Sequence, residues 1–269
     1  MTSVDQATHA ERSVTYTRMI DLSTGIAHQA VHEPWPPTVS PIRHDVEGLE
    51  WMEGMFGVTR DELTVSGGLG PAFEEVTAIT HCGTHVDAPW HYGPTSGGAP
   101  AKRIDECPLE WFFSDGVVLD LRHKQPGERI SVDDLERGLA VIGHRLAPLE
   151  IVMLMTGRDA HLGTKEYFEQ PGMSRESTLW LTGQGIRVIG IDAYGFDRRF
   201  EDMRDEYQRT GDASILWEAH FAGIEQEYCQ IEKLVNLDHI PRPTGFKVAC
   251  FPIKVEGGSG GWCRAVAFV

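Results

Sequence analysis

Four short apolar runs, separated by segments with helical patterns, limit this chain to a small set of folds. Each run has the length of a buried strand and is too short for a typical core helix. Strands that alternate with helices are typical of an α/β domain. The runs are 116–121 (GVVLDL), 150–155 (EIVMLM), 186–191 (IRVIGI) and 246–253 (FKVACFPI). The sequence therefore predicts the α/β class for a chain of 269 residues that shows no internal repeat.

Three segments between these runs begin with residues that commonly cap helices. Ser131 and Ser174 open the first two segments, and Asp212 opens the third, which is expected to end at Gly223. The predicted helices span 131–140, 174–185 and 212–222.

Two further segments are expected to extend outward from the body of the domain. Residues 33–44 (EPWPPTVSPIRH) contain four prolines, which block both a helix and a central strand. They are expected to form an extended arm or loop anchored by Trp35. The charged tract 197–209 (DRRFEDMRDEYQR) is expected to be a solvated, lid-like excursion.

Three histidines and an aspartate lie within eleven residues of each other, at His81, His85, Asp87 and His91. Imidazole and carboxylate together suit zinc, manganese or iron(II). A straight strand would hold His81 and His85 about 13 Å apart, too far for one ion. The chain is therefore expected to turn at Gly83 and to extend through His85 and Asp87. Pro89 then redirects the backbone so that His91 returns to the same point.

Composition excludes several kinds of partner and site. The formal charge of −16 argues against nucleic acid and against an anionic membrane surface. No apolar run approaches the roughly 20 residues of a membrane span, and the N-terminus shows no secretory signal. Five scattered cysteines form no thiolate zinc motif, so reduced thiols and a cytoplasmic location are expected.

The pattern His81-x-Gly-Thr-His85-x-Asp87-x-Pro-x-His91 resembles the signature of the metal-dependent cyclase-like hydrolase family, which includes bacterial kynurenine formamidase and isatin hydrolase. The resemblance continues in short segments at 21–23, 155–158, 171–174, 190–192, 231–238 and 251–267. It covers residues 19–269 and implies a single domain of the cyclase-like (swivelling β/β/α) type. Residues 1–18 would form an N-terminal tail, and the Pro-rich arm would follow within the domain.

The resemblance also implies a set of site residues. His81, His85 and Asp87 would hold a first divalent ion, and Asp87, His220 and Glu232 a second, so that one or two zinc or manganese ions are expected per subunit. A continuous helix would separate His220 from Glu232 by about 18 Å. Glu232 is therefore expected on a separate element. His91 would act as general base and acid.

Trp35 and Trp90 are candidates for the substrate pocket, with core packing as the alternative for either. The activity implied is hydrolysis of an amide C–N bond in a small cyclic or aryl amide, such as an isatin-like lactam or an N-formyl arylamine. A lactone hydrolase, another ring-opening or cyclase reaction, and a non-catalytic metal-binding or small-molecule-binding protein are the alternatives. His91 argues against the last, because a pure binding site needs no base. The family further implies a homo-oligomer, either dimer or tetramer.

Overall fold

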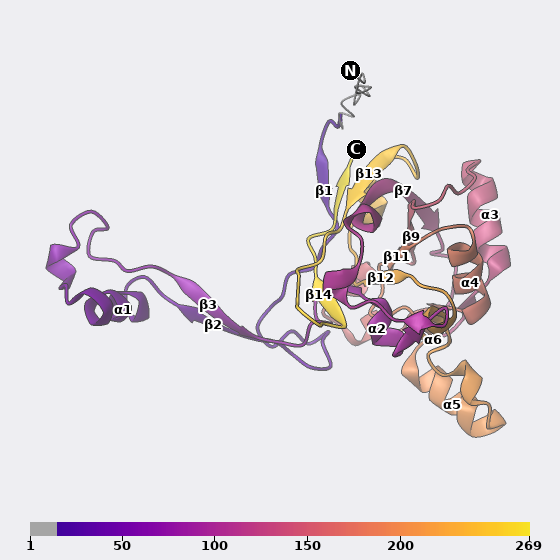
Figure 1. The fold of residues 1–269 in the computed structure, drawn as a ribbon, viewed down its shortest axis with the longest axis horizontal. Coiled ribbons are helices and arrows are strands. Elements are labelled where there is room, and N and C mark those ends of the chain that lie inside the picture. Colours follow the sequence, from indigo (N-terminus) through magenta and orange to yellow (C-terminus); the bar gives the residue numbers. More distant parts are fainter. Residues whose placement is uncertain (1–14) are drawn as a thin grey trace, which may run out of the picture.

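The computed structural model describes residues 15–269, so most of the expected tail, 1–14, lies outside the described residues. The body is built around a nine-stranded mixed sheet with the order β1-β15-β13-β7-β9-β11-β12-β4-β14 (Figure 1). The strands are β1 (Met19–Asp21), β4 (His85–Asp87), β7 (Phe113–Asp120), β9 (Ile151–Met155), β11 (Val188–Ile191), β12 (Cys229–Glu232), β13 (Phe246–Ala249), β14 (Gly260–Trp262) and β15 (Val266–Phe268). The predicted α/β class is confirmed, whereas the domain boundary at residue 18 stays a prediction.

The apolar runs form the middle of this sheet. The first three are β7, β9 and β11, which are parallel to one another, and the fourth is β13, antiparallel to β7. Parallel strands are covered on both faces, which explains why the first three runs are apolar at most positions. Along β9, Val152 and Leu154 join one hydrophobic cluster while Ile151, Met153 and Met155 join the cluster on the opposite face. The core therefore has two halves, one on each side of the sheet.

Helices α3 (Val132–Ile142), α4 (Arg175–Gly183) and α6 (Glu218–Glu225) cover the face that holds Val152 and Leu154 (Figure 1). The first two begin as predicted, because the hydroxyls of Ser131 and Ser174 each accept a hydrogen bond from the backbone N–H three residues on.

The prediction for residues 212–222 was wrong at both ends. Trp217 adopts a left-handed conformation with φ 51°, so α6 begins only at Glu218, and Asp212 instead caps the 3₁₀ turn Ala213–Ile215. The helix then runs through Gly223, where the ring of Tyr92 leaves no space for a side chain.

Residues 38–77 project from the body as a long arm (Figure 1). Strands β2 (Thr38–Ile42) and β3 (Phe73–Thr77) pair antiparallel, and α1 (Glu47–Phe56) and the 3₁₀ turn Arg60–Glu62 lie beyond them. A two-stranded ribbon has free edges, so it tolerates Pro41 within β2. The prolines thus accompany an excursion that is much longer than residues 33–44.

The remaining elements are short, apart from the helix over residues 200–210. They are α2 (Pro89–Tyr92), α5 (Phe200–Thr210), β5 (Thr95–Ser96), β6 (Ala99–Pro100), β8 (Arg129–Ile130) and β10 (Gly172–Met173), with 3₁₀ turns at 104–106, 109–112, 158–161, 165–168 and 237–239. Within residues 15–269, none of the helices has both the length and the apolar character needed to cross a membrane.

Candidate metal centre

The histidine-rich segment follows the path expected from its glycine and proline. Gly83 turns the chain with φ 58°, a left-handed conformation that suits glycine. His85 and Asp87 then lie on β4, where alternate residues face the same side of the sheet. Pro89 is the first residue of α2, a position for which its fixed φ is suited, and this short helix brings His91 back over the strand.

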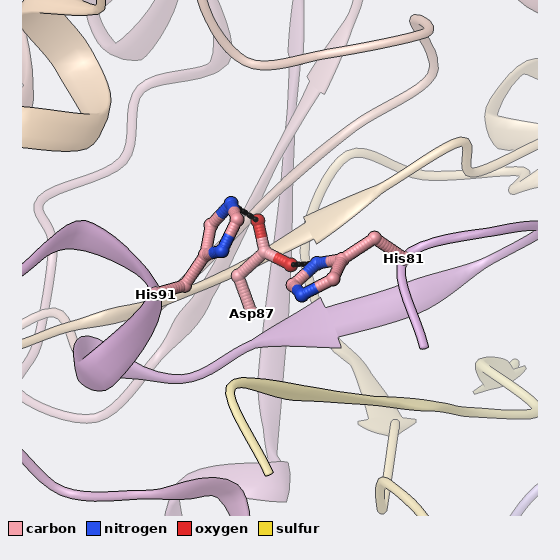
Figure 2. A group of neighbouring side chains, drawn as sticks. All are labelled: His81, Asp87 and His91. Carbon is pink, nitrogen blue, oxygen red and sulfur yellow. Dashed lines mark hydrogen bonds and ion pairs between the residues drawn. The ribbon is translucent and has the colours of Figure 1, made fainter. Parts of the chain in front are cut away.

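Asp87 lies at the centre of the cluster. Its Oδ1 atom is 2.6 Å from Nδ1 of His81 and 3.1 Å from Nε2 of His85. Its Oδ2 atom faces Nε2 of His91 at 3.9 Å. Figure 2 shows the carboxylate between the rings of His81 and His91, with one oxygen directed toward each.

Two further elements bring the remaining predicted ligands to the same point. Glu232 is the register partner of His85 on the neighbouring strand β12, and its Oε2 atom is 3.7 Å from Nε2 of His85. His220 comes from α6, with Nε2 at 3.8 Å from Asp87 and 3.5 Å from Glu232. The fold thus brings together all six residues expected at the metal centre, although His220 and Glu232 are on separate elements.

The ring orientation of three histidines suits metal binding. In each, one ring nitrogen contacts an outer partner, which leaves the other directed at the carboxylates, as is usual for metal-ligating histidines. The Nε2 atom of His85 is buried and has no hydrogen-bond partner among residues 15–269, so a cation there would satisfy an otherwise unpaired atom. The outer contacts are His81 Nε2 with Ser259 Oγ (2.9 Å), His85 Nδ1 with the carbonyl oxygen of Gly83 (2.9 Å), and His220 Nδ1 with Asp197.

The charges of the cluster also favour a cation. Burial alone would raise the pKa of Asp87, but the imidazoles of His91 and His85 hold it well below its usual range. Burial and the charge of Asp87 raise the pKa of Glu232. Burial lowers the pKa of His91 to about 4, so this imidazole is neutral at pH 7. Although burial alone would lower it, the carboxylate of Asp197 raises the pKa of His220 to about 9. A divalent cation would displace a proton from this imidazole, and two buried carboxylates with converging imidazole nitrogens form a donor set that suits zinc or manganese.

Sequence reasoning missed Gln230, which lies at the middle of the cluster. Its Nε2 atom is 2.9 Å from Oδ2 of Asp87, 2.8 Å from Nε2 of His220 and 3.0 Å from Oε1 of Glu232. Gln230 precedes Glu232 by two positions on β12, so both side chains face the same side of the sheet. The two-residue spacing of Gln230 and Glu232 could have indicated a shared face. These polar residues, however, interrupt the apolar pattern from which the strand would have been predicted.

Asp197 was also missed, because the tract 197–209 was expected to be solvated. Its side chain is only 3 % exposed. The carboxylate accepts hydrogen bonds from the backbone N–H groups of Ala219 and His220 and also contacts the His220 ring. The start of the tract is therefore part of the site, while α5 carries the more exposed remainder. The expectation of a solvated excursion was wrong for the start of the tract, because Asp197 and Arg198 are buried and paired.

A cavity of about 500 Å³ opens onto the metal centre, within the size range of small-molecule sites. Trp35 lies in its wall, as expected, although it remains 66 % exposed. Trp90 does not line the cavity, because its ring lies beneath the guanidinium group of Arg103 at 4.1 Å. The expected pocket role of Trp90 is thus not supported by its position. Other aromatic residues in the wall are Phe168, Tyr194, Phe196, Phe200 and Trp217.

Known proteins are similar to this chain in sequence and in fold. The profile of the cyclase family, described as "Putative cyclase", matches residues 20–198. Kynurenine formamidase from Erythrobacter litoralis is 27% identical over 198 residues, which are 71% of this chain and 74% of that protein. Kynurenine formamidase from Salinibacter ruber is 25% identical over 234 residues, covering 85% of this chain and 93% of its own.

Solved structures show the same architecture. An isatin hydrolase bound to the product analogue thioisatinate superposes with a TM-score of 0.71 at 20% identity, covering 93% of this chain and 92% of that chain. Isatin hydrolase A from Ralstonia solanacearum superposes with a TM-score of 0.71 at 23% identity, covering 93% and 91%. The arrangement of strands and helices around the site is therefore one that these proteins share.

Proposed function

Because the chain belongs to the cyclase family, we propose that it is a metal-dependent hydrolase that cleaves the C–N bond of a small aromatic amide, either a cyclic amide or an N-formyl arylamine. One observation carries the proposal. Three histidine nitrogens, each oriented by an outer contact, converge with Asp87 and Glu232 at the end of an aromatic cavity. The names of the related formamidases and isatin hydrolases support the class of bond cleaved.

We propose that one divalent ion, zinc or manganese, is held by His81, His85 and Asp87. Support comes from the converging nitrogens of His81 and His85, both directed at the same oxygen of Asp87. The residues implied as ligands of a second ion are Asp87, His220 and Glu232. Each of them already contacts the side-chain amide nitrogen of Gln230. Because these contacts engage all three side chains, they support a single ion per chain.

A divalent ion in this set supplies Lewis acidity, which acidifies water and polarises a substrate carbonyl. His91 takes the proton of the attacking water at Nε2 and passes it to the leaving nitrogen. Burial lowers the pKa of His91 to about 4, so the imidazole is unprotonated at pH 7 and has a lone pair free for this proton. Its ring stacks on His81 with centroids 4.1 Å apart, and among the described residues no group hydrogen-bonds to it. Both ring nitrogens of His91 are thus available for proton transfer.

We propose that the preferred substrate is uncharged and planar. The aromatic walls suit stacking on a ring. The cations at the cavity are already paired, since Arg199 contacts Asp202 at 2.6 Å and Arg198 contacts Glu206 at 2.7 Å. A carboxylate on the substrate would compete with these acids and would be repelled by Glu201, which also lines the cavity.

We propose that the protein is a homo-oligomer in which the arm of residues 38–77 packs against a second copy. The support is the projection of the arm from the body (Figure 1) and the apolar side chains that it leaves exposed. Isolated two-stranded ribbons are marginally stable in water, so such an arm is expected to need a partner surface. The exposed apolar residues include Trp51, Met55, Phe56, Phe73 and Val76.

We also propose a cytoplasmic location. All five cysteines are buried free thiols, a state that suits a reducing compartment.

Hydrolysis assays on protein loaded with Mn²⁺ or Zn²⁺ test the activity. Formanilide and isatin are the uncharged amides, and each is assayed before and after dialysis against EDTA. We expect metal-dependent turnover of at least one, restored when the ion is returned. Turnover of lactones in place of both amides would contradict the proposed bond, and activity that survives complete removal of metal would contradict the mechanism.

A further inference from the structure

A buried ion pair connects the segment before the arm to the strand that carries Glu232. The Nζ atom of Lys233 is 2.6 Å from Oε2 of Glu33, and each side chain is 3 % exposed. Removing two charges from water is costly unless additional hydrogen bonds satisfy both groups. The other contacts of the pair therefore indicate what it holds in place.

Those contacts lead to the histidine-bearing turn. Oε1 of Glu33 accepts a hydrogen bond of 2.7 Å from the backbone N–H of Gly83, and Nζ of Lys233 donates one of 3.0 Å to the carbonyl oxygen of His81. The carbonyl oxygen of Gly83 in turn contacts Nδ1 of His85 at 2.9 Å. The ion pair thus holds the backbone on both sides of the turn that sets His81 relative to His85.

The backbone of Lys233 is itself held in an uncommon conformation. Its φ of 61° lies in the left-handed region, which a residue with a long side chain adopts only where the surroundings require it. Its N–H donates to the carbonyl oxygen of Ala193 at 3.0 Å, and its carbonyl accepts from the hydroxyl of Thr84 at 2.6 Å. Lys233 directly follows Glu232, so these contacts also determine how the end of β12 presents that carboxylate.

We propose that Glu33 and Lys233 form a positioning pair that sets His81, His85 and Glu232 for metal binding, so that affinity for the ion depends on the segment preceding the arm. This inference rests on the metal centre of the proposed function. Neither residue ligates the ion in this arrangement; both act through the backbone of residues that do. Outer partners of metal ligands typically change affinity about 10- to 100-fold when they are removed.

The test is a titration of metal-free, full-length protein with Mn²⁺, in which free Mn²⁺ is followed by electron paramagnetic resonance. We compare the unmodified chain with Glu33→Gln and Lys233→Met, which keep approximate side-chain volume and remove one charge. We expect a Kd for Mn²⁺ about 10- to 100-fold weaker in each variant. In the double variant no charge is left unpaired, so its folding is the least compromised, and we expect its affinity to remain at least tenfold below that of the unmodified chain.

Lys124→Met is the matched control, because Lys124 forms a partly buried ion pair with Asp134 (3.0 Å) away from the metal centre. We expect this variant to lose thermal stability but to bind Mn²⁺ normally. Unchanged Mn²⁺ affinity in both Glu33→Gln and the double variant would overturn the positioning role alone. Equal weakening in Lys124→Met, in proportion to its lower Tm, would assign the effect to general stability and would also overturn it. Failure of the unmodified chain to bind Mn²⁺ or Zn²⁺ would instead refute the metal centre.

Discussion

Gln230 and Asp87 are register partners on the antiparallel strands β12 and β4, and Nε2 of Gln230 lies 2.9 Å from Oδ2 of Asp87. Because the two residues face each other across the ladder, the position of the amide follows from strand pairing and needs no flexible loop. Tyr228 fixes the other end of the amide, with its hydroxyl donating to Oε1 at 2.9 Å. The amide of Gln230 thus contacts Oδ2 of Asp87, whereas the other carboxylate oxygen, Oδ1, faces His81 and His85.

Replacing Gln230 tests the number of ions. In Gln230→Ala, the amide no longer contacts Asp87, His220 and Glu232, and those three residues become available to a cation. We expect Mn²⁺ stoichiometry at saturation, measured by elemental analysis, to rise from one ion per chain toward two. A stoichiometry of two in the unmodified chain would contradict the single-ion proposal.

Replacing His91 separates catalysis from metal binding. In His91→Ala, the ring that exchanges protons is lost while His81, His85 and Asp87 are retained. We expect metal content to stay unchanged and kcat to fall about 10²- to 10⁴-fold, as is typical for loss of a general base. His85→Ala is the comparison variant, since it should lose the ion as well as the activity. Full turnover by metal-loaded His91→Ala would refute the role assigned to this histidine.

Charge on the substrate should matter more than size. We expect kcat/KM for formanilide to exceed that for 2-formamidobenzoate by about tenfold or more. The carboxylate of 2-formamidobenzoate would meet arginines that are already paired with acids, and Glu201 at the cavity would repel it. Steady-state assays with the two compounds measure this ratio. The uncharged methyl ester of 2-formamidobenzoate controls for bulk and should resemble formanilide. A preference for the carboxylate would contradict the substrate class.

Metal removal should lower stability measurably, because an ion that binds only the folded chain stabilises it by mass action. At a free Mn²⁺ concentration of 100 times Kd, the expected gain in free energy of unfolding is about 2.7 kcal/mol. Denaturant unfolding of the EDTA-treated protein, with and without added Mn²⁺, measures the difference. Mg²⁺ is the control ion, since a site rich in imidazole is a poor match for it.

The decrease in the free energy of unfolding at acidic pH should depend on Asp134. Burial alone would raise its pKa, but hydrogen bonds from the backbone of Ser131 and from Lys124 hold it well below its usual range. A lowered folded-state pKa stabilises the fold above the unfolded value near 3.9, and this contribution disappears as pH falls through the folded value. In Asp134→Asn, we expect a loss of about 1–2 kcal/mol at pH 7 that shrinks steadily below about pH 4.

Urea unfolding between pH 7 and pH 2.5 measures this contribution. The neighbouring exposed residue supplies the control, because Asp133→Asn removes the same charge without removing the contacts of the cap. A loss in Asp134→Asn that is constant over this pH range would show that ionisation of the carboxylate is not its source.

The sequence by itself determined the class of the fold and the local path of the ligand segment. Runs such as 150–155 are apolar at nearly every position and are too short for a typical core helix, a combination typical of a strand covered on both faces. Gly83 and Pro89 determined where the chain turns between His81 and His91, because each restricts the backbone locally. The helix caps at Ser131 and Ser174 likewise depend only on residues close by in the sequence. The gathering of His81, His85 and His91 around Asp87 could thus be predicted before any tertiary contact was known, whereas His220 and Glu232 were implied only by the family resemblance.

Tertiary structure decided what the remaining polar residues do. Gln230 and Glu232 break the apolar pattern of β12, so the strand is visible only once β11 and β4 pair with it. Asp197 belongs to a charged tract, and only the packing of α6 buries it against His220. Glu33 and Lys233 are 200 positions apart, and nothing local to either predicts their ion pair. Side-chain burial and pairing across such separations depend on the assembled sheet, which is why composition and spacing could not reveal them.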